Sequence, residues 1–385
     1  MCTIGELTTK VGSGVTPRGG EAVYKTEGHP FVRSQNVGLG NLLLDDIAFI
    51  DEETHLRQKN TELQFNDVLL NITGASIGRS ALVDKQIVGG NVNQHVCIIR
   101  TKENLVPSFI CSFLLSNYGQ RQIDSFQAGG NRQGLNFEQI KSIKITIPSK
   151  DEQIKIAKLL RAIDERIATQ NKIIEKLQSL IKGLNDHILK NIEGDQVCFA
   201  DLGEAYGGLS GKSGDDFGYG DPFITYMNVY QNTYISENDY ELVQIAPDEK
   251  QNSVQYGDAL FTLSSETPEE VGMGAVYLGK SQKLYLNSFC FGVHFHGNRV
   301  LPQYIAHFIS STSFRKAIYP LAQGSTRFNL QKQDFMRMKF VLPSLEEQKR
   351  IATALDALYN HLANEKLLTE QYLLLKQYLL QQMFI

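Results

Sequence analysis

The sequence predicts an α+β protein in which two repeated globular domains are separated by a long antiparallel two-helix coiled coil with pseudo-twofold symmetry. Three observations lead to this fold class. Motifs of the first half of the chain return in order in the second half, each copy closes on a Pro that acidic residues and a Gln follow, and an apolar heptad begins after each closure.

The internal repeat is the first of these observations. Residues 28–31 (Gly-His-Pro-Phe) return as 220–223 (Gly-Asp-Pro-Phe), and Asp67–Leu70 returns as Asp258–Phe261. Further along, the match keeps one offset and pairs Arg132 with Arg327, Leu135 with Leu330, Pro148 with Pro343, Glu152 with Glu347 and Gln153 with Gln348. Such self-similarity indicates that one structural unit is built twice.

Each globular part, over residues 1–150 and 195–345, is expected to mix short strands with a short helix. β-branched and aromatic runs alternate with turns that contain Gly and Asn, which is typical of strands. In the first copy these runs are Phe31–Val37, Val68–Thr73, Val92–Arg100 and Ile143–Ile147. A short amphipathic helix is expected after Pro107, with its counterpart after Pro302.

A long helix is expected after each globular part, over residues 151–194 and 346–385. Acidic residues behind Pro148 and Pro343 suit the positive end of a helix dipole. In the first helix, spacings of four and three alternate and only Gln170 is polar, which is a strong coiled-coil signal. The seam is Ile156, Leu160, Ile163, Ile167, Gln170, Ile174, Leu177, Ile181, Leu184 and Ile188.

The second helix has a weaker seam and a surplus of leucines beside it. Two packed helices would leave that extra apolar surface in water, so we expect it to contact another protein. The alternative is that these leucines belong only to the core of the helix pair. The candidate partner-binding residues are Leu367, Leu368, Leu374 and Leu375.

Connectivity then fixes the direction of the helices. A helix of about 40 residues is roughly 60 Å long, so the first one carries the chain away from the first domain. The second helix can pair with the first only by running back. We therefore expect an antiparallel pair with a domain at each end.

Composition and charge narrow the function classes. A chain of 385 residues with 42% apolar content suggests two to three soluble domains. No apolar run reaches the roughly 18 residues that cross a bilayer, and the N-terminus lacks a secretory layout, so we expect a cytoplasmic protein without a membrane partner. The five cysteines are expected to be reduced. A net charge of −4 gives weak attraction to phosphate, so binding to DNA would need cationic surface from a partner.

The repeated domain, the Pro, the Glu-Gln helix start and the heptad together resemble the specificity subunits of Type I restriction-modification systems. The segments that carry the resemblance best are Phe31–Val37, Asp67–Gly78 and Gly129–Phe137. The resemblance implies target-recognition domains over 1–150 and 195–345 that bind double-stranded DNA. It also implies that helices 151–194 and 346–385 dock two methyltransferase subunits and, through them, endonuclease and translocase subunits. The second copy departs from the first at residues 264–267, so roles there transfer less directly.

Residue types mark a candidate DNA face in each domain. Arg is the usual bidentate reader of guanine and Asn or Gln of adenine, while hydroxyls hold phosphates. For any one residue a solvated or turn-stabilising role is an equal alternative, but matching positions recur in both copies. The candidates are Arg33, Gln35, Thr73, Ser76, Arg79, Asn93, Gln94 and Arg132 in the first domain, and Tyr226, Asn228, Ser264, Ser265, Asn287, Ser288, Arg327 and Asn329 in the second.

We expect no catalytic residue, cofactor or metal. Residues 206–213 resemble a phosphate-binding loop, but Tyr206 stands where that motif needs Gly. Residues 221–223 (Asp-Pro-Phe) resemble a methyltransferase loop but hold one Pro, and the first copy has His in place of Asp, which indicates a turn. His294 and His296 have no third ligand nearby in sequence, which favours packing over a metal site.

Other functions stay open. A recognition protein that has lost its catalytic partners would have the same sequence features, and genomic neighbourhood would distinguish it. A structural coiled-coil adaptor would not need two diverged patches of Arg, Asn and Gln. An autonomous nuclease or methyltransferase is disfavoured because no motif for either is present.

Overall fold

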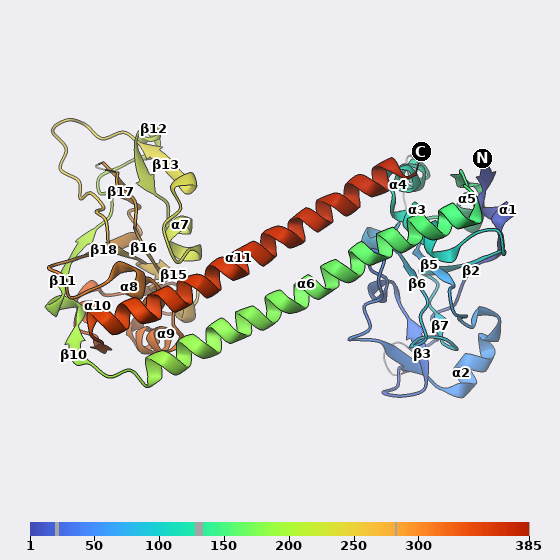
Figure 1. The fold of residues 1–385 in the computed structure, drawn as a ribbon, viewed down its shortest axis with the longest axis horizontal. Coiled ribbons are helices and arrows are strands. Elements are labelled where there is room, and N and C mark those ends of the chain that lie inside the picture. The colour runs from blue at the N-terminus through green and yellow to red at the C-terminus, as the bar shows by residue number, and fades with distance from the viewer. Residues whose placement is uncertain (20–22, 128–133, 282, 385) are drawn as a thin grey trace. The chain divides into compact units, whose positions relative to one another are not determined.

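The computed structural model describes residues 1–19, 23–127, 134–281 and 283–384 (Figure 1). The chain folds into two compact units, Met1–Lys172 with Lys366–Ile385, and Ile173–Glu365. Each unit holds one globular domain and a segment of each of the two long helices, α6 (Lys150–Lys190) and α11 (Leu345–Gln382). Two matched α+β domains and two long helices confirm the predicted fold class.

The first domain is built on a four-stranded sheet of order β2-β8-β5-β6, beside a three-stranded sheet β4-β3-β7 and the pair β1-β9. Its strands are β1 (Cys2–Thr3), β2 (Thr8–Ser13), β3 (His29–Val32), β4 (Ala48–Ile50), β5 (Val68–Asn71), β6 (Ser80–Leu82), β7 (Asn91–Val92), β8 (Val96–Thr101) and β9 (Lys144–Ile145). Its helices are α1 (Ile4–Leu7), α2 (Glu52–Arg57), α3 (Pro107–Leu115), α4 (Asn117–Ser125) and α5 (Phe137–Ser142).

The second domain repeats this topology, with sheets β11-β18-β14-β16 and β13-β12-β17 and the pair β10-β21, and adds β15-β20-β19. Its strands are β10 (Asp195–Cys198), β11 (Gly203–Gly207), β12 (Phe217–Ile224), β13 (Tyr240–Val243), β14 (Ala259–Thr262), β15 (Ser264–Ser265), β16 (Gly274–Val276), β17 (Tyr285–Leu286), β18 (Cys290–Phe295), β19 (Ala322–Gln323), β20 (Phe328–Leu330) and β21 (Lys339–Leu342). Its helices are α7 (Tyr226–Gln231), α8 (Pro302–Ile309), α9 (Thr312–Ile318) and α10 (Lys332–Met336).

The observed strands are shorter than the predicted ones. The chain leaves β3 after Val32 for a 3-10 turn at Ser34–Asn36, and β5 ends at Asn71. In both places an Asn side chain takes over the hydrogen bonding: Asn36 Nδ2 donates to the Leu43 carbonyl at 2.9 Å, and Asn71 Nδ2 donates to that of Ser34 at 2.8 Å. Side chains of this kind offer the backbone an alternative to the strand ladder.

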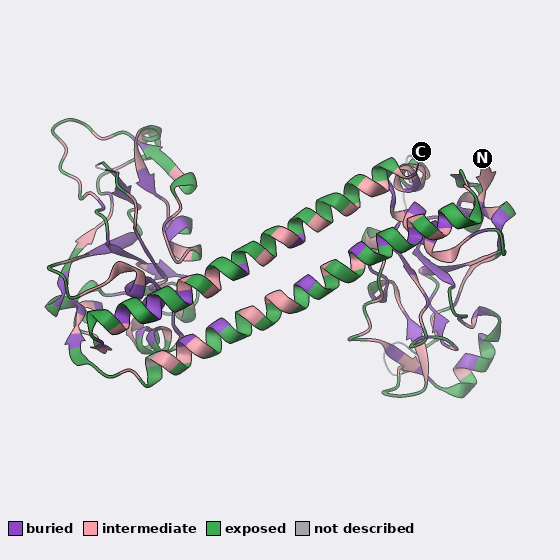
Figure 2. Cartoon of the chain, in the orientation of Figure 1, coloured by how far each residue is buried: buried purple, intermediate pink, exposed green. Residues whose placement is uncertain are grey.

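The two central strands of each four-stranded sheet, β5 and β8 in the first domain and β14 and β18 in the second, are buried on both faces along most of their length, and buried segments are purple in Figure 2. In the first domain, Val68 and Leu70 pack with α3, while Leu69 between them packs in a separate cluster with Val32. Alternate side chains of a strand point to opposite faces, so one strand serves two cores. This explains why the strand sequences are nearly continuous apolar runs.

A buried Gln fixes the start of each long helix onto its domain. Gln153 Oε1 accepts a hydrogen bond from the Val106 amide at 2.9 Å, and Gln348 Oε1 accepts one from the Leu301 amide at 2.7 Å. Each Gln also donates through Nε2 to the carbonyl of the preceding Pro, at 3.0 and 2.9 Å. The Gln of each repeated Glu-Gln pair therefore holds the start of a long helix against the start of the short helix at Pro107 or Pro302. We call this contact the clasp.

The two long helices run antiparallel within the first unit. Lys376 Nζ lies 2.5 Å from Asp164 Oδ1, and Arg166 Nε donates to the Tyr372 hydroxyl at 3.4 Å, so rising numbers in α6 meet falling numbers in α11. Phe384, just beyond α11, packs against Phe109 with ring centroids 5.1 Å apart. The antiparallel direction predicted from connectivity is confirmed here.

In the second unit, α11 meets α8 through a buried histidine. His307 Nε2 lies 2.7 Å from Asp356 Oδ1, and its Nδ1 has no hydrogen-bond partner among the described residues. Burial lowers the pKa of His307, outweighing the attraction of Asp356, which raises it. The imidazole is thus held neutral, with Nε2–H donating to the carboxylate.

We expect acidification to loosen this contact. A histidine whose folded pKa is depressed contributes stability above its unfolded pKa of about 6.5, and this contribution is lost as the pH falls below that value and through the folded pKa. His307→Gln keeps a donor towards Asp356 and cannot titrate. Thermal melting of both chains between pH 8 and pH 5.5 tests this, and parallel pH profiles of the two melting temperatures would contradict the expectation.

Candidate nucleic-acid interface

Three loop segments meet at one edge of the four-stranded sheet in the first unit. The Ile72 amide donates to the His95 carbonyl at 3.0 Å, and the Leu135 amide donates to the Ile72 carbonyl at 2.8 Å. Segments 72–76, 93–95 and 134–135 therefore lie side by side, and we call them the first loop junction. Thr73, Ser76, Asn93 and Gln94, predicted from separate parts of the sequence, all belong to it.

The second unit contains the same arrangement. The Leu263 amide donates to the Phe289 carbonyl, and the Leu330 amide donates to the Leu263 carbonyl, both at 2.8 Å. Segments 263–265, 287–289 and 327–330 form the second loop junction, where Ser264 pairs with Asn329 across β15 and β20. All the second-domain candidates except Tyr226 and Asn228 belong to it.

Asn93 and Asn287 hold the middle segment of each junction in the same way. The Asn93 Oδ1 accepts a hydrogen bond from the His95 amide at 3.0 Å, and the Asn287 Oδ1 accepts one from the Phe289 amide at 2.9 Å. A short polar side chain that caps the backbone two residues on is a common turn device. These two predicted DNA contacts thus shape the loop.

Arg33 and Gln35 lie beside the first loop junction and share one acceptor residue. Arg33 Nη2 donates to the Asp46 carbonyl at 2.7 Å, and Gln35 Nε2 donates to the Asp46 carboxylate. The Arg33 guanidinium also lies 5.4 Å from the centroid of the Tyr24 ring. Gln35 is exposed, while Arg33 is half-buried.

A hydrogen-bonded relay crosses the first loop junction. Gln94 Oε1 accepts from the Thr16 amide at 2.9 Å, which leaves Gln94 Nε2 to donate to His95 Nε2, also at 2.9 Å. His95 Nδ1 then carries the proton and donates to Thr73 Oγ1 at 2.6 Å. Both ring nitrogens of His95 are therefore engaged, and the relay fixes its neutral tautomer.

Ser76 and Arg79 follow on the same loop. Ser76 Oγ accepts from Asn71 Nδ2 at 3.1 Å, and Arg79 is exposed. Arg132, the remaining first-domain candidate, lies outside the described residues.

In the second unit several candidates are occupied by internal contacts. The Tyr226 hydroxyl donates to the Ser264 carbonyl at 2.8 Å, and burial raises the pKa of this tyrosine. Asn228 is fully buried and donates to the Ser236 carbonyl at 2.8 Å, while the Ser265 hydroxyl donates to Glu270 at 3.3 Å.

Ser288, Arg327 and Asn329 are exposed at the second loop junction. Arg327 closes the turn between β19 and β20, where Gly324 has φ +137° and a Cβ would meet the Arg327 carbonyl oxygen at 2.1 Å. The Arg327 guanidinium lies 5.7 Å from the centroid of the exposed Phe289 ring.

The sequence interpretation missed His95 and Phe289. They occupy equivalent places, since each carbonyl accepts the same sheet-edge amide and each follows the Asn that holds the loop. The signal was present, because Asn93-Gln94-His95 and Asn287-Ser288-Phe289 each precede the strand β8 or β18 by the same distance. A comparison of the two copies that looks only for identical residues does not detect this equal spacing.

At the strand ends opposite each junction, a buried Asp ties the sheet together. Asp67 receives two hydrogen bonds from Arg100, both 2.7 Å long, and Asp258 contacts His294 Nδ1 at 2.8 Å and the Tyr206 hydroxyl at 2.6 Å. Burial raises the pKa of Asp258, against the hydrogen bonds that lower it. His294 is thus a packing partner of this carboxylate. Across the described residues, no group of three His, Cys, Asp or Glu side chains could hold a metal ion.

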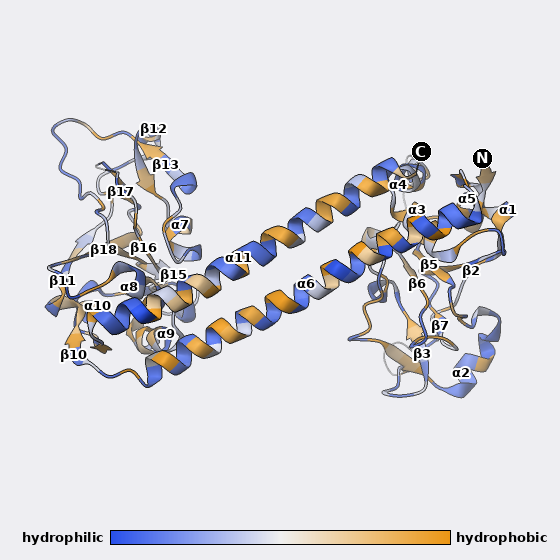
Figure 3. Ribbon diagram, in the orientation of Figure 1, coloured by the Kyte–Doolittle hydropathy of each residue, from blue (hydrophilic) through white to orange (hydrophobic). Residues whose placement is uncertain are grey.

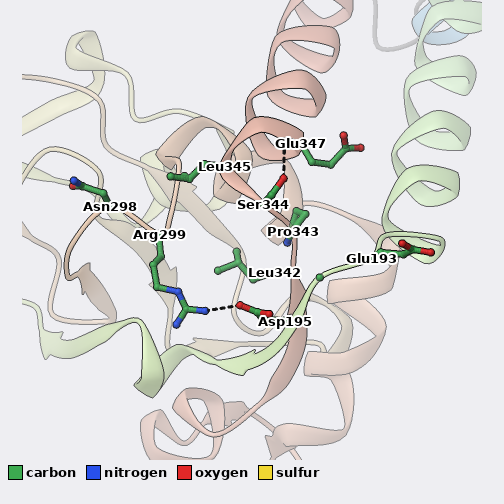
Figure 4. Close-up of a pocket in the computed structure, with 10 residues that line it drawn as sticks. Glu193, Asp195, Asn298, Arg299, Leu342, Pro343, Ser344, Leu345 and Glu347 are labelled. Carbon is green, nitrogen blue, oxygen red and sulfur yellow. Dashed lines mark hydrogen bonds and ion pairs between the residues drawn. The ribbon is translucent and has the colours of Figure 1, made fainter.

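A cavity of about 610 Å³ lies at the start of α11 in the second unit (Figure 4). Arg299 Nη2 pairs with Asp195 at 3.0 Å on one side, and the Ser344 hydroxyl caps the helix by accepting the Glu347 amide at 3.3 Å. Glu193 and Glu347 add carboxylates to its wall. The capped helix end and the paired Arg299 make this cavity a poor site for phosphate.

Two further observations bear on partners and location. Lys212, the lysine of the sequence that resembles a phosphate-binding loop, pairs with Glu249 at 2.5 Å and donates to the Gln244 carbonyl at 2.6 Å. Within the described ranges, none of the helices has the length and apolar character to cross a membrane.

Comparison with known proteins relates both halves of the chain to one family. The model described as "Type I restriction modification DNA specificity domain" matches residues 1–179 and again residues 195–371. The chain is 23% identical to the Type I restriction enzyme EcoKI specificity subunit of Escherichia coli (strain K12), over 93% of this chain and 82% of that protein. It is 22% identical to the putative Type I restriction enzyme MjaX specificity subunit of Methanocaldococcus jannaschii, over 86% of this chain and 80% of that protein.

Solved structures share the fold. The S subunit of a Type I restriction-modification system from M. genitalium aligns with a TM-score of 0.57 and 14% identity, over 100% of this chain and 95% of that one. The HsdS subunit from Thermoanaerobacter tengcongensis aligns with a TM-score of 0.52 and 15% identity, over 98% and 94%.

Proposed function

The chain belongs to the family of Type I restriction-modification DNA specificity domains, and on that premise we propose that it reads a bipartite DNA target, one half-site with each loop junction. The observation that carries this proposal is the junction itself, which is built twice with the same backbone hydrogen bonds and different exposed side chains. A common scaffold with divergent side chains is what two readers of different half-sites need.

The residues proposed to face DNA divide into two groups. Gln35, Arg79, Gln94, Ser288, Arg327 and Asn329 are exposed, so that bases or phosphates can reach them. The other candidates within the described ranges are more enclosed, and we assign them to positioning the loops: Arg33, Thr73, Ser76, Asn93, Tyr226, Asn228, Ser264, Ser265 and Asn287.

We assign the chemistry to partners. The chain serves as a non-catalytic scaffold that docks two methyltransferase subunits and, through them, endonuclease and translocase subunits. Support for docking comes from the C-terminal part of α11, where orange apolar bands recur in Figure 3. There Leu367, Leu374 and Tyr378 lie on one helix face at spacings of seven and four, and they are 55%, 65% and 59% exposed.

The two domains are expected to read independently. Exchanging residues 1–150 for another recognition domain should change one half of the methylated motif and leave the other half intact. Single-molecule methylation sequencing of a host that carries the parent gene, the exchanged gene or no gene measures this. A motif changed in both halves would contradict independent reading, and a host methylome unaffected by the gene would contradict the proposed function.

A further inference from the structure

Phe289 is an apolar side chain exposed in polar surroundings at the second loop junction. It is 54% exposed and belongs to none of the buried clusters among the described residues. Its neighbours on the loop, Asn287 and Ser288, are polar. The free energy falls when a partner covers a large exposed aromatic ring and removes it from water.

At Phe289 the backbone makes the hydrogen bonds that hold the loop, and the aromatic ring takes no part in them. The Phe289 carbonyl accepts the Leu263 amide, and its amide donates to Asn287. The equivalent His95 makes the same two backbone contacts, while its ring is engaged by Thr73 and Gln94. The scaffold therefore accepts different side chains here, as a specificity-determining position requires.

Arg327 gives the ring a cationic neighbour. Its guanidinium lies 5.7 Å from the Phe289 centroid, within the range of a cation–π contact. Stacking on a ring restricts the rotamers of a long side chain, so less conformational freedom is lost when that side chain meets a ligand. The pair presents a flat apolar face and a bidentate donor side by side.

These two chemistries match two adjacent features of the major groove. Thymine exposes its C5-methyl group there, which apolar side chains contact, and guanine exposes O6 and N7, which Arg contacts with two hydrogen bonds. Base pairs rise about 3.4 Å, so the separation of the two groups spans roughly one or two steps.

We propose that Phe289 and Arg327 together read a thymine methyl group and a guanine that lie within two base pairs of each other in the half-site of the second domain. This inference rests on the proposed function and names the chemistry of one of its two half-sites. His95, whose ring is already engaged, gives the first half-site no such apolar contact.

The test uses the chain in complex with its methyltransferase partner and duplexes that carry the motif found by methylation sequencing. Each thymine is replaced in turn by deoxyuridine, which lacks only the methyl group, and each guanine by 7-deazaguanine. We expect one deoxyuridine substitution in one half-site to weaken binding about fourfold. A 7-deazaguanine within two base pairs of it should weaken binding about tenfold.

Variants then assign each effect to its residue. With Phe289→Ala the deoxyuridine effect should vanish while the 7-deazaguanine effect remains, and with Arg327→Ala the reverse should hold. Phe289→Leu should retain part of the methyl effect. Unchanged melting temperatures would show that these exposed substitutions leave the fold intact.

The outcomes separate this inference from the proposed function. A parent complex that binds motif and scrambled duplexes equally would overturn the proposed function. A complex that binds the motif specifically, but whose deoxyuridine effect is missing or survives Phe289→Ala, would overturn the assignment of the pair and leave sequence recognition standing.

Discussion

Gln348→Glu should lower the free energy of unfolding of the second unit by about 3 kcal/mol. Gln348 is fully buried, and its Nε2 donates to the carbonyls of Arg299 and Pro343, both at 2.9 Å. A carboxylate in its place has no N–H to donate to these carbonyls. Its negatively charged oxygen would also lie next to their partially negative oxygens and be repelled by them. Calorimetric unfolding measures the loss, and hydrogen exchange should localise it to the contact of α8 with α11.

The pH dependence of the free energy of unfolding of this variant gives a second test. Facing two carbonyls, the new carboxyl should bind its proton more tightly in the folded than in the unfolded chain, so its folded pKa is raised. The destabilisation is then smallest below the unfolded Glu pKa of about 4.3 and grows as the pH rises through the folded pKa.

Gln371→Glu is the matched control, since Gln371 lies exposed on the same helix. It should change the free energy of unfolding by less than about 0.5 kcal/mol. Gln153→Glu should reproduce the Gln348 effect in the first unit, where the same three contacts recur. Equal stability of the Gln348 and Gln371 variants would show that the clasp contributes nothing.

Leu367→Glu combined with Leu374→Glu should weaken methyltransferase binding about 100-fold, because each leucine contributes roughly 1.5 kcal/mol or more when a partner covers it. Both leucines are exposed, so the isolated chain should melt as before. Co-purification and titration calorimetry with the methyltransferase subunit measure the loss.

The affinity for DNA should fall together with the affinity for the methyltransferase. The chain has a net charge of −4, so we expect it to bind duplex poorly alone and to gain affinity from the cationic surface of its partner. Filter binding of the chain alone, the parent complex and the variant mixture compares these states. Equal affinity of the chain alone and the parent complex would contradict this dependence.

Two controls separate apolar contact from charge and from exposure alone. The doubly substituted Leu367→Gln, Leu374→Gln chain should lose most of the same affinity without added charge. Leu56→Glu alters a leucine of α2 that is 56% exposed, outside the long helices, and should leave methyltransferase binding unchanged. Undiminished binding by the glutamate pair would exclude this face of α11 as the docking surface.

The sequence and the structure answer different questions about the recognition residues. Residue type selected Arg33, Asn93 and Asn228 as readers, yet each makes internal contacts: with Asp46, with the His95 amide and with the Ser236 carbonyl. Type alone cannot tell a loop-holding Asn from a base-reading one, because both uses need the same amide group. Only neighbours distant in the chain distinguish them.

The sequence by itself determined the repeat, the α+β class, the heptad of α6 and the antiparallel direction of the helices. These features follow from local periodicity and from connectivity, and both are written along the chain. The tertiary structure alone decided that the repeated Gln is a clasp and that three segments distant in sequence form each loop junction. Those relations rest on hydrogen bonds between residues more than sixty positions apart, such as Leu135 to Ile72 and Leu330 to Leu263, and no local pattern encodes which distant amide meets which carbonyl.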